Sequence, residues 1–468
     1  MPAGGTWQSQ NKVRPGAYIN VVGVPKPLGS IGDRGVVAIV MEPGWGEQLT
    51  RMSANEFLTG AGLYKIGANY TDDSDVARQL RLVFQGAASV IIRRSNTGQV
   101  KASATIASGT CTATAKYAGT FGNNISLKVT LNTTSTEDDP PVVTLNSVTV
   151  ETYVNGVLKA KLTSADKTAF SNDWVDISAS ALSSFVAGDY SLSGGTNGSA
   201  DSLTNVFADL EQENWNTLAF PATSSTDKDA AVAFVKSLRD DCGIKVQAVV
   251  TECTGTDANG YTFASYAPDY EGIYVCKQGY RLSDATVVSP IDEVYMLAGM
   301  IAGATITESL TGTVIPNAIE VLHGPKTNAD IIDAINTGKL VLSKRRDGAI
   351  VIEYDVNSFT SLTAKKGKVF TKGRPVRVMD NIANDIKGMF DKTYLGKVSN
   401  DEDGRGIFKA NIIKYMNDLQ KMGAVQNFDS ETDIEVIAGD DTDAVVVGLW
   451  VQPVDSMEKL YMTVNVWG

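Results

Sequence analysis

The sequence has 468 residues, of which 43% are hydrophobic and 20% are charged, a composition typical of folded protein. This length exceeds what one ordinary core can organise, so we expect about three domains. The 53 acidic and 41 basic residues give a net charge of −12, which repels the phosphate backbone and argues against nucleic acid as the main ligand. The longest basic cluster, Lys344-Arg345-Arg346, is better explained as a solvated edge or a subunit contact.

The cysteines and the apolar runs exclude further classes of protein. Four widely spaced cysteines without a C-x-x-C pair favour neither a disulfide framework nor a zinc site, and we expect folding in a reducing cytoplasm. The N-terminal residues lack the basic-then-apolar order of a signal peptide. The longest apolar run, Val294–Ile306, has 13 residues where a bilayer needs about 20, so we predict a buried helix and no membrane insertion.

The first 34 residues are predicted to form an N-terminal arm and linker. Ala17–Val22 is a short β-like run, and residues 22–34 (VGVPKPLGSIGDR) are punctuated by Pro and Gly. At roughly 3.3 Å per residue such a linker reaches about 40 Å, which is about the width of a domain. The N-terminal strand is therefore able to leave its own body.

Residues 35–100 are predicted to be the first part of a layered α/β domain. Gly35–Glu42 is a continuous apolar strand, Ser74–Phe84 has one apolar helical face, and Ser89–Arg94 is a second strand. This order of strand, helix and strand is typical of an α/β layer.

Residues 101–195 are predicted to be an inserted all-β domain. The segments Ile125–Leu131 and Ser147–Val154 are rich in β-forming residues, and Asn155–Val157 carries a hairpin signal. Thr134–Pro141 (TSTEDDPP) is predicted to be a mobile loop. An insertion into one α/β domain explains the order of elements better than four separate domains.

Residues 196–345 are predicted to continue the interrupted α/β domain. The expected helices and strands, in chain order, are a helix at Ser202–Glu211, a strand at Asn216–Phe220, a helix at Asp227–Asp240, strands at Ile244–Val250 and Gly272–Cys276, a helix at Ile291–Thr305, a helix at Asn328–Asn336, and strands near Lys339–Leu342 and Ala349–Asp355.

Residues 346–468 are predicted to form a small α/β domain with a terminal strand. Two apolar helical faces are expected, one on Met379, Ile382, Ile386, Met389 and Phe390, the other on Phe408, Ile412, Tyr415, Met416 and Leu419, with Gly423 as the helix stop. Strands are expected at Asp433–Ala438, Ala444–Val454 and Lys459–Val466. In the last, Leu460, Met462, Val464 and Val466 alternate with polar and aromatic residues, which is typical of a half-buried strand.

Residues that could carry catalysis or bind a metal or cofactor are scarce, and we predict no enzyme, metal site or cofactor. The single histidine, His323, lies before Gly-Pro and is expected to have a structural role in a turn. Ser399–Gly406 resembles a calcium loop, but Ala410 stands where a bidentate Glu is required, so an acidic turn and helix cap is expected instead. No P-loop occurs, Gly194–Ser199 is expected to be a joining loop, and Gly439–Asp443 a hairpin turn.

Several stretches together resemble contractile tail sheath proteins of bacteriophages and of phage-like particles from Gram-positive bacteria. The most specific are Arg377–Phe428 and Val451–Val466, where a helix, a G-K-x-x-N-like turn, a second helix and a terminal strand follow one another. Weaker matches are Lys116–Val129, Ser191–Gly198 and the opening residues 4–20. The inserted β domain is the part in which such proteins differ most.

The resemblance implies a helical homo-oligomer in which the terminal arms of each subunit add strands to neighbouring subunits. The matching inter-subunit strand residues are Tyr18, Ile19, Val21, Leu460, Met462, Val464 and Val466. The implied partners are further copies of the chain, a tail tube protein, and baseplate and tail terminator proteins. The implied place is a virion tail or phage-like particle assembled in the bacterial host cytoplasm.

The leading hypothesis is a structural sheath that contracts and drives a tube through a target cell envelope. One alternative within the class is the sheath of a secretion system or bacteriocin-like particle, which lacks neighbouring capsid genes. A different class is a carbohydrate-binding virion surface protein, which predicts saccharide binding by the isolated insertion and no polymer. An enzyme with a scattered site is the third, and it predicts a deep pocket lined by acids with shifted pKa values.

Overall fold

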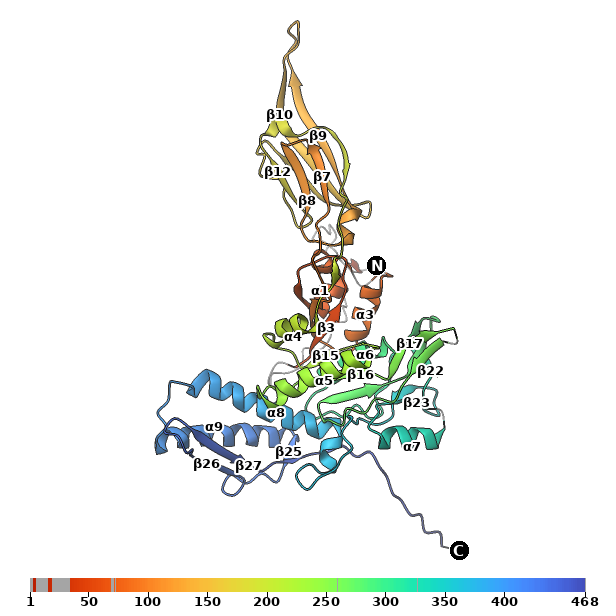
Figure 1. Cartoon of the computed structure of the whole chain (residues 1–468), viewed down its shortest axis with the longest axis vertical. Helices are drawn as coiled ribbons and strands as arrows, with labels where there is room; N and C mark the ends of the chain where they lie inside the picture. The colour runs from red at the N-terminus through yellow and green to blue at the C-terminus, as the bar shows by residue number, and fades with distance from the viewer. Residues whose placement is uncertain are drawn as a thin grey trace.

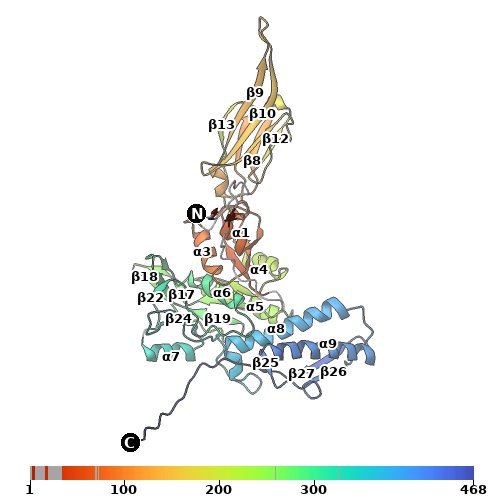
Figure 2. The ribbon, with the colours of Figure 1, turned by 180° about the vertical axis from the view of Figure 1, so that it is seen from behind.

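The computed structural model describes residues 34–68, 71, 73–258, 260–325 and 327–467, together with the backbone of β1 (Ala3–Gly5) and β2 (Gly16–Tyr18). The molecule is elongated: a β-rich unit stands at one end, an α/β body lies in the middle, and a helical unit extends sideways at the other end (Figure 1). The last residues leave the body as a separate extended segment, and the view from behind shows the same separation (Figure 2). The mixed α/β multidomain architecture predicted from the sequence is therefore present.

A six-stranded sheet organises the body, in the order β19-β16-β15-β3-β5-β4. Every neighbouring pair is parallel except β4 with β5, which is antiparallel. The strands are β3 (Val36–Met41), β4 (Leu49–Ser53), β5 (Ser89–Arg94), β15 (Thr217–Ala219), β16 (Gln247–Thr251) and β19 (Ile273–Cys276). Parallel strands covered on both faces are almost continuously apolar, which is why β3 and β5 were recognisable in the sequence.

Helices cover both faces of this sheet. Alternate β3 side chains point to opposite cores: Val37 and Ile39 pack with α3 and α6, whereas Ala38 packs with α4 and α5. The helices are α1 (Ala54–Thr59), α2 (Leu63–Ile66), α3 (Asp75–Val83), α4 (Leu203–Glu211), α5 (Ser225–Asp240) and α6 (Glu293–Gly303). The body is thus a three-layer α/β domain, and the four longer helices are confirmed.

Local sequence explains where these helices begin and how closely they pack. The side chains of Ser74, Ser202 and Ser224 accept hydrogen bonds from the first turns of α3, α4 and α5. A Cβ on Gly299 of α6 would lie 2.1 Å from the carbonyl oxygen of Val83, so the approach of α6 to α3 requires glycine there.

A group of small sheets extends the body beside α7 (Asn328–Asn336). These are the hairpin β17 (Cys253–Asp257) and β18 (Gly260–Phe263), the sheet of β20 (Gly279–Leu282), β21 (Val287–Val288) and β22 (Ala318–Leu322), and the hairpin β23 (Leu342–Lys344) and β24 (Ile350–Ile352). His323 follows β22 with a positive φ of 60°, so its predicted place in a turn is confirmed. Because β23 and β24 pair across the expected boundary at residues 345 and 346, we propose that the boundary lies after β24.

The inserted unit is a sandwich of two antiparallel sheets. One has the order β11-β10-β9-β13 and the other β12-β8-β7. Its strands are β7 (Ser103–Ala107), β8 (Cys111–Ala115), β9 (Ile125–Ser135), β10 (Val143–Val154), β11 (Val157–Ser164), β12 (Val175–Ala179) and β13 (Gly188–Ser191). The predicted loop at Thr134–Pro141 is shorter than expected, because Thr134 and Ser135 continue β9 against β10. Asn155 and Gly156 have positive φ, as the predicted hairpin turn requires.

The neck between insertion and body is tied by strand pairing and aromatic packing. Strands β6 (Asn96–Thr97) and β14 (Ser199–Ala200) pair where the chain leaves and re-enters the body. Trp45, which belongs to the body segment of the chain, is fully buried against Trp174 and Phe121 of the insertion. The sandwich is therefore packed onto the body rather than hung from a flexible linker.

The C-terminal unit consists of two long helices over a hairpin. Its elements are α8 (Gly373–Met389), a π-helical turn (Phe390–Tyr394), α9 (Glu402–Lys421), β25 (Val425–Gln426), β26 (Ile434–Ala438), β27 (Val445–Leu449) and β28 (Gln452–Pro453). Asp401 caps α9 by accepting a hydrogen bond from Gly404 N. The segment Ser399–Gly406, which only partly resembles a calcium loop, is therefore the predicted acidic turn and helix cap. The Gly439–Asp443 turn joins β26 to β27 as predicted.

The two terminal strands differ from what the sequence suggested. β2 covers only Ala17 and Tyr18 of the predicted Ala17–Val22 strand and pairs in parallel with the unpredicted β1. Ile19 and Val21 lie outside the described residues. No strand is assigned to the described residues after β28, so the expected half-buried strand at Lys459–Val466 is extended and exposed in the single chain.

Candidate functional site

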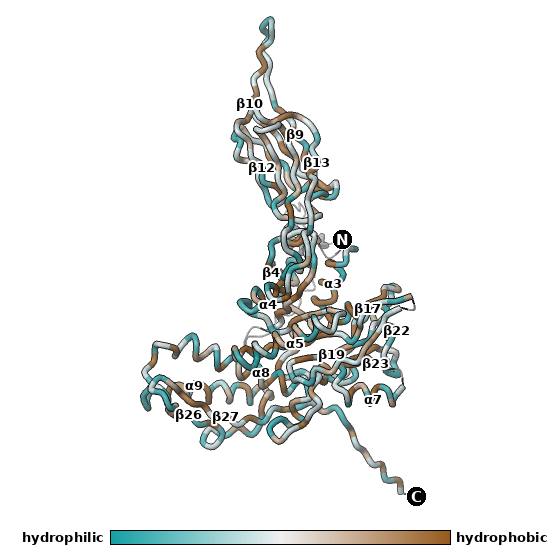
Figure 3. Tube along the Cα trace, viewed as in Figure 1, coloured by the Kyte–Doolittle hydropathy of each residue, from teal (hydrophilic) through white to brown (hydrophobic). Residues whose placement is uncertain are grey.

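The C-terminal arm, defined here as Lys459–Trp467, is an amphipathic strand sequence that pairs with no strand among the described residues. The alternating residues Leu460, Met462, Val464 and Val466 are 84%, 73%, 70% and 88% exposed. Apolar residues thus lie in open space along a segment that leaves the body (Figure 3). A strand with a free edge and an apolar face is a template for pairing with another chain.

The C-terminal unit itself offers a matching incomplete layer. β26 and β27 form a sheet of only two strands, and their inward residues Val436, Val445 and Val447 are partly exposed. Beside β27 lies a groove of about 490 Å³, lined by Phe390, Tyr394 and Phe408 of the helical layer together with Val445. An isolated two-stranded sheet is marginal, and further strands beside it would cover these apolar groups.

Helix α8 holds the chain on both sides, where the N-terminal segment enters and where the C-terminal arm leaves. Arg34, the last residue of the predicted N-terminal arm and linker, donates a 2.5 Å hydrogen bond from Nη1 to Asn381 Oδ1 of α8. Burial, followed by the nearby Arg377, lowers the pKa of Arg34 to about 9. At the other side, Arg374 Nη1 donates to Ser456 Oγ at 2.8 Å, and Lys372 forms ion pairs with Asp455 and Glu458.

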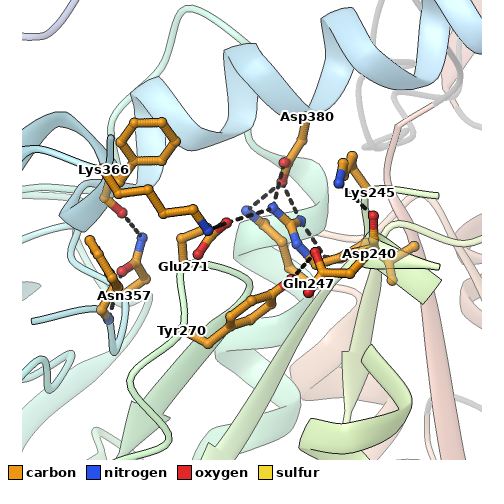
Figure 4. A network of polar contacts seen from close by, with 12 residues as sticks. Asp240, Lys245, Gln247, Tyr270, Glu271, Asn357, Lys366 and Asp380 are labelled. Carbon is orange, nitrogen blue, oxygen red and sulfur yellow. Dashed lines mark hydrogen bonds and ion pairs between the residues drawn. The ribbon is translucent and has the colours of Figure 1, made fainter. Parts of the chain in front are cut away.

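A buried ion pair joins α8 to the α/β body (Figure 4). Arg239 of α5 donates from Nη1 and Nη2 to the two carboxylate oxygens of Asp380, both at 2.8 Å. Burial acts to lower the pKa of the Arg239 guanidinium, but the Asp380 carboxylate outweighs it and raises that pKa above its ordinary value. Gln247 of β16 adds a 3.3 Å hydrogen bond to the same carboxylate.

Further polar contacts extend this joint on both sides. Tyr270 donates to Asp240 at 2.9 Å, and Lys366 pairs with Glu271 at 2.7 Å (Figure 4). Deeper in the joint, the fully buried Arg377 lies 3.5 Å from Asp355 and donates to the Glu308 carbonyl at 2.7 Å. Burial raises the pKa of the Asp355 carboxyl despite this guanidinium. The joint therefore holds α8, and with it the roots of the arms, firmly on the body.

The joint could not be identified from the sequence, because its residues come together only in the folded chain. Arg239 and Asp380 are 141 positions apart, and the local sequence around each is that of a polar residue on the surface of a helix. Of the predicted strand residues, the structure places Tyr18 opposite Gly5 in the β1–β2 pair, and it leaves Leu460, Met462, Val464 and Val466 exposed. It does not bring the two sets together among the residues it describes.

The described residues offer no assembled centre for metal chemistry. Within the described ranges, no three His, Cys, Asp or Glu side chains gather as a metal site needs. The four cysteines are unpaired. None of the helices in these described ranges is long and apolar enough to cross a membrane.

Comparison with known proteins adds independent evidence. Residues 196–358 match the family model for the phage tail sheath protein central domain, and residues 365–467 match the phage tail sheath C-terminal domain. The chain is 33% identical to the phage-like element PBSX protein XkdK of Bacillus subtilis (strain 168), over 99% of each chain.

Solved structures agree in fold. The sheath tail protein from Desulfitobacterium hafniense has a TM-score of 0.73 at 33% identity, covering 96% of this chain and 100% of that chain. The helical sheath of the anti-feeding prophage in its contracted state has a TM-score of 0.54 at 12% identity, covering 97% and 99%. The second likeness shows a shared fold alone.

Proposed function

Because this chain belongs to the phage tail sheath protein family, we propose that it is the subunit of a contractile sheath, which polymerises helically around a tail tube. Contraction of that sheath drives the tube through the envelope of a target cell. The partners in this proposal are further copies of the chain, the tube protein, and the baseplate and terminator proteins at the two ends. The particle is a virion tail or a phage-like particle assembled in the host cytoplasm.

The observation that carries the proposal is the exposed amphipathic C-terminal arm. An extended segment can add to a sheet edge of another subunit, with the backbone supplying affinity and alternate side chains supplying specificity. We propose that Leu460, Met462, Val464 and Val466 enter the apolar layer beside β27 of a neighbouring subunit, whose groove is lined by Phe390 and Phe408. Tyr18, Ile19 and Val21 are proposed to serve a second neighbour.

The energetics of such linkages suit a moving polymer. A strand of about six residues contributes several kcal/mol at roughly 0.5–1.5 kcal/mol per hydrogen bond, and burial of each apolar side chain adds about 1.5–3 kcal/mol. A head-to-tail contact that does not close on itself generates an open helical filament. Flexible arms can keep subunits connected while their rigid bodies change position.

Truncation tests the proposal directly. Deleting residues 1–22, or the arm from Leu460 onward, is expected to leave a cooperatively folded monomer with an almost unchanged Tm that no longer forms tubes. The measurements are circular dichroism melting and negative-stain electron microscopy. Formation of regular tubes by either truncated protein would contradict the strand-exchange proposal.

A matched pair of variants tests which face of the arm is buried. Met462→Lys with Val464→Lys places charges on the apolar face, whereas Thr463→Lys with Asn465→Lys adds the same charge to the other face. All four side chains are exposed in the single chain, so neither variant should lower the Tm. Only the first is expected to abolish tubes, and equal assembly by both would contradict the proposed orientation.

A phage-like particle is favoured over a complete phage by one finding, the similarity to a protein named for a phage-like element. A neighbouring set of capsid genes would favour a phage, and their absence would favour a bacteriocin-like or secretion particle. Electron microscopy of particles released after induction would show directly whether sheathed tails carry heads.

A further inference from the structure

Glu458 is an unusually buried residue for its place in the chain. Its side chain is 6% exposed, although the arm that begins one residue later is almost fully exposed. Glu458 Oε1 accepts hydrogen bonds from Ser309 Oγ and Thr311 Oγ1, both at 2.8 Å. Its other carboxylate oxygen accepts from Lys372 Nζ.

These contacts join parts of the chain that are far apart in sequence. Ser309 and Thr311 belong to the segment that follows α6 in the body, whereas Lys372 is the residue before α8. Thr311 Oγ1 also accepts from Asp355 N at 2.9 Å, which connects the site to the buried Asp355 and Arg377. The carboxylate of Glu458 therefore reaches the interior of the joint.

The charges around Glu458 are balanced by Lys372 and arranged over an aromatic ring. Lys372 Nζ also lies 2.5 Å from Asp455 Oδ2 and 5.2 Å from the centre of the Tyr354 ring. Lys459 Nζ lies 5.5 Å from the same ring. Burial acts to lower the pKa of Lys372, but hydrogen bonds to Asp455 and Glu458 outweigh it and raise the pKa, so the lysine stays charged.

We infer that Glu458 is a positioning residue: together with Ser309, Thr311, Lys372 and Asp455 it forms a clamp that fixes the direction in which the C-terminal arm leaves the subunit. The inference rests on the proposed strand exchange and adds to it a built-in device that aims the strand. Among the described residues, the hydrogen bonds and ion pairs of the clamp do not involve the arm from Leu460 onward, and in this inference the clamp does not itself bind the neighbouring subunit. Its effect on assembly is therefore exerted through the arm.

The physical reason is preorganisation. A strand held at a fixed root samples fewer directions before it meets a neighbour, so association loses less conformational freedom. The same restriction raises the effective concentration of the arm near its target when the first contact between two subunits has formed. An arm freed at Asp455 instead of Lys459 gains several rotatable residues, and its pairing weakens although its sequence is intact.

Trypsin cleavage after Lys459 in the full-length chain measures the clamp independently of assembly. The protease needs several residues on each side of the bond in extended form, so the clamp must open before cleavage. Glu458→Ala is expected to accelerate release of the segment beginning at Leu460 about tenfold or more, because hydrogen bonds to a charged group hold the root. Intact-mass spectrometry at a protein concentration below the onset of tube formation gives the rate.

Three comparisons complete the test. Glu458→Gln keeps an acceptor for Ser309 and Thr311 but loses the ion pair, so cleavage should accelerate less than in Glu458→Ala. Glu320→Ala removes an exposed ion pair with Arg281 far from the arm and should leave the rate unchanged. The minimum concentration for tube formation, measured by sedimentation, should rise several-fold in Glu458→Ala and remain at the wild-type value in Glu320→Ala.

The outcomes separate the clamp from strand exchange. Faster cleavage with a raised assembly concentration and a Tm close to that of the wild type supports the clamp. Unchanged cleavage, or faster cleavage with unchanged assembly, overturns it even if deletion of the arm abolishes tubes. Normal tubes after deletion of the arm instead overturn the strand exchange itself. If Glu458→Ala does not fold, Glu458→Gln and Ser309→Ala decide by the same cleavage and assembly measurements.

Discussion

At the scale of single residues, the buried pair of Arg239 and Asp380 is a bidentate connection between the α/β body and α8. Both side chains are almost fully inaccessible to solvent, with 3% and 6% exposure, and the pair is bidentate. Removing one partner leaves an uncompensated charge in a low-dielectric environment, which is far more destabilising than removing an exposed pair.

Asp380→Ala is therefore expected to lower the free energy of unfolding by about 3–5 kcal/mol. The matched control is Asp391→Ala in the π-helical turn after α8, which removes an exposed ion pair with Lys387 and should change stability by less than about 1 kcal/mol. Urea unfolding followed by circular dichroism measures both. Equal small effects would show that the joint does not depend on this pair.

A second residue, Glu293, links stability to pH. It lies fully buried in the first turn of α6 and accepts a 2.8 Å hydrogen bond from Gln278 N. Burial raises the pKa of its carboxyl from 4.5 to about 8, although hydrogen bonds from Cys276 and Gln278 act against the shift. Between these two pKa values the folded state keeps the proton that the unfolded state has lost.

The contribution of Glu293 to stability should thus be complete below about pH 4.5 and decline as the pH rises toward 8, by up to about 1.4 kcal/mol per pH unit. Glu293→Gln cannot ionise, so its stability relative to the wild type should increase over the same interval. Urea midpoints at several pH values in this window give the difference, and Glu320→Gln on the surface is the control. A difference that does not vary with pH would contradict the assignment.

At the scale of elements, prediction from the sequence succeeded where periodicity or composition acts locally. α3, α4, α5, α7 and α9 carry a serine, threonine or aspartate cap at their first turn. β3, β5, β9 and β10 are long apolar or alternating runs, and they were found for that reason.

Elements were missed where tertiary pairing decides the conformation. β17 and β18 are rich in Thr and Gly and pair with each other through a register shift, and β21 has only two residues. The turn-flanked α1 and α2 are too short for a helical period to show. The predicted start of β16 was three residues early, because Ile244–Val246 precede the paired strand although they are apolar enough to resemble it.

At the scale of the whole molecule, the site has three parts that lie far apart in the sequence. They are the C-terminal arm, the Glu458 clamp at its base, and the Arg239–Asp380 joint between α8 and the body. The amphipathic character of the arm could be predicted from the sequence alone, since the alternation of apolar with other residues is a local pattern. The Glu458 clamp and the Arg239–Asp380 joint could not be predicted from the sequence, because both depend on how α8 packs against the body. The sequence thus predicted the segment that we propose to link subunits, whereas the structure adds how the root of that segment is held.

The inserted sandwich offers the last prediction at this scale. Val100 and Thr196 exchange two backbone hydrogen bonds of 3.1 Å at the neck, so the chain on either side of the insertion is already close enough for a short turn. Replacing residues 101–195 by a four-residue Gly/Ser turn is therefore expected to leave the body and the C-terminal unit folded and able to form tubes. We propose that the sandwich faces outward from the filament, so its removal should not affect the arms or the clamp.

Replacing the sandwich would expose the Trp45 ring, so the shortened chain needs a second change. Trp45 would lose the packing of Trp174, Phe121 and Tyr117 and expose its ring, which promotes non-specific association. The shortened chain should therefore be made with Trp45→Gln, and the full-length Trp45→Gln protein serves as control for the lost packing. Differential scanning calorimetry should retain the main cooperative transition in the shortened chain, and microscopy should show tubes. Loss of that transition in the shortened chain alone would mean that the sandwich and the body fold as one unit, because their shared core at Trp45 would then be essential to both.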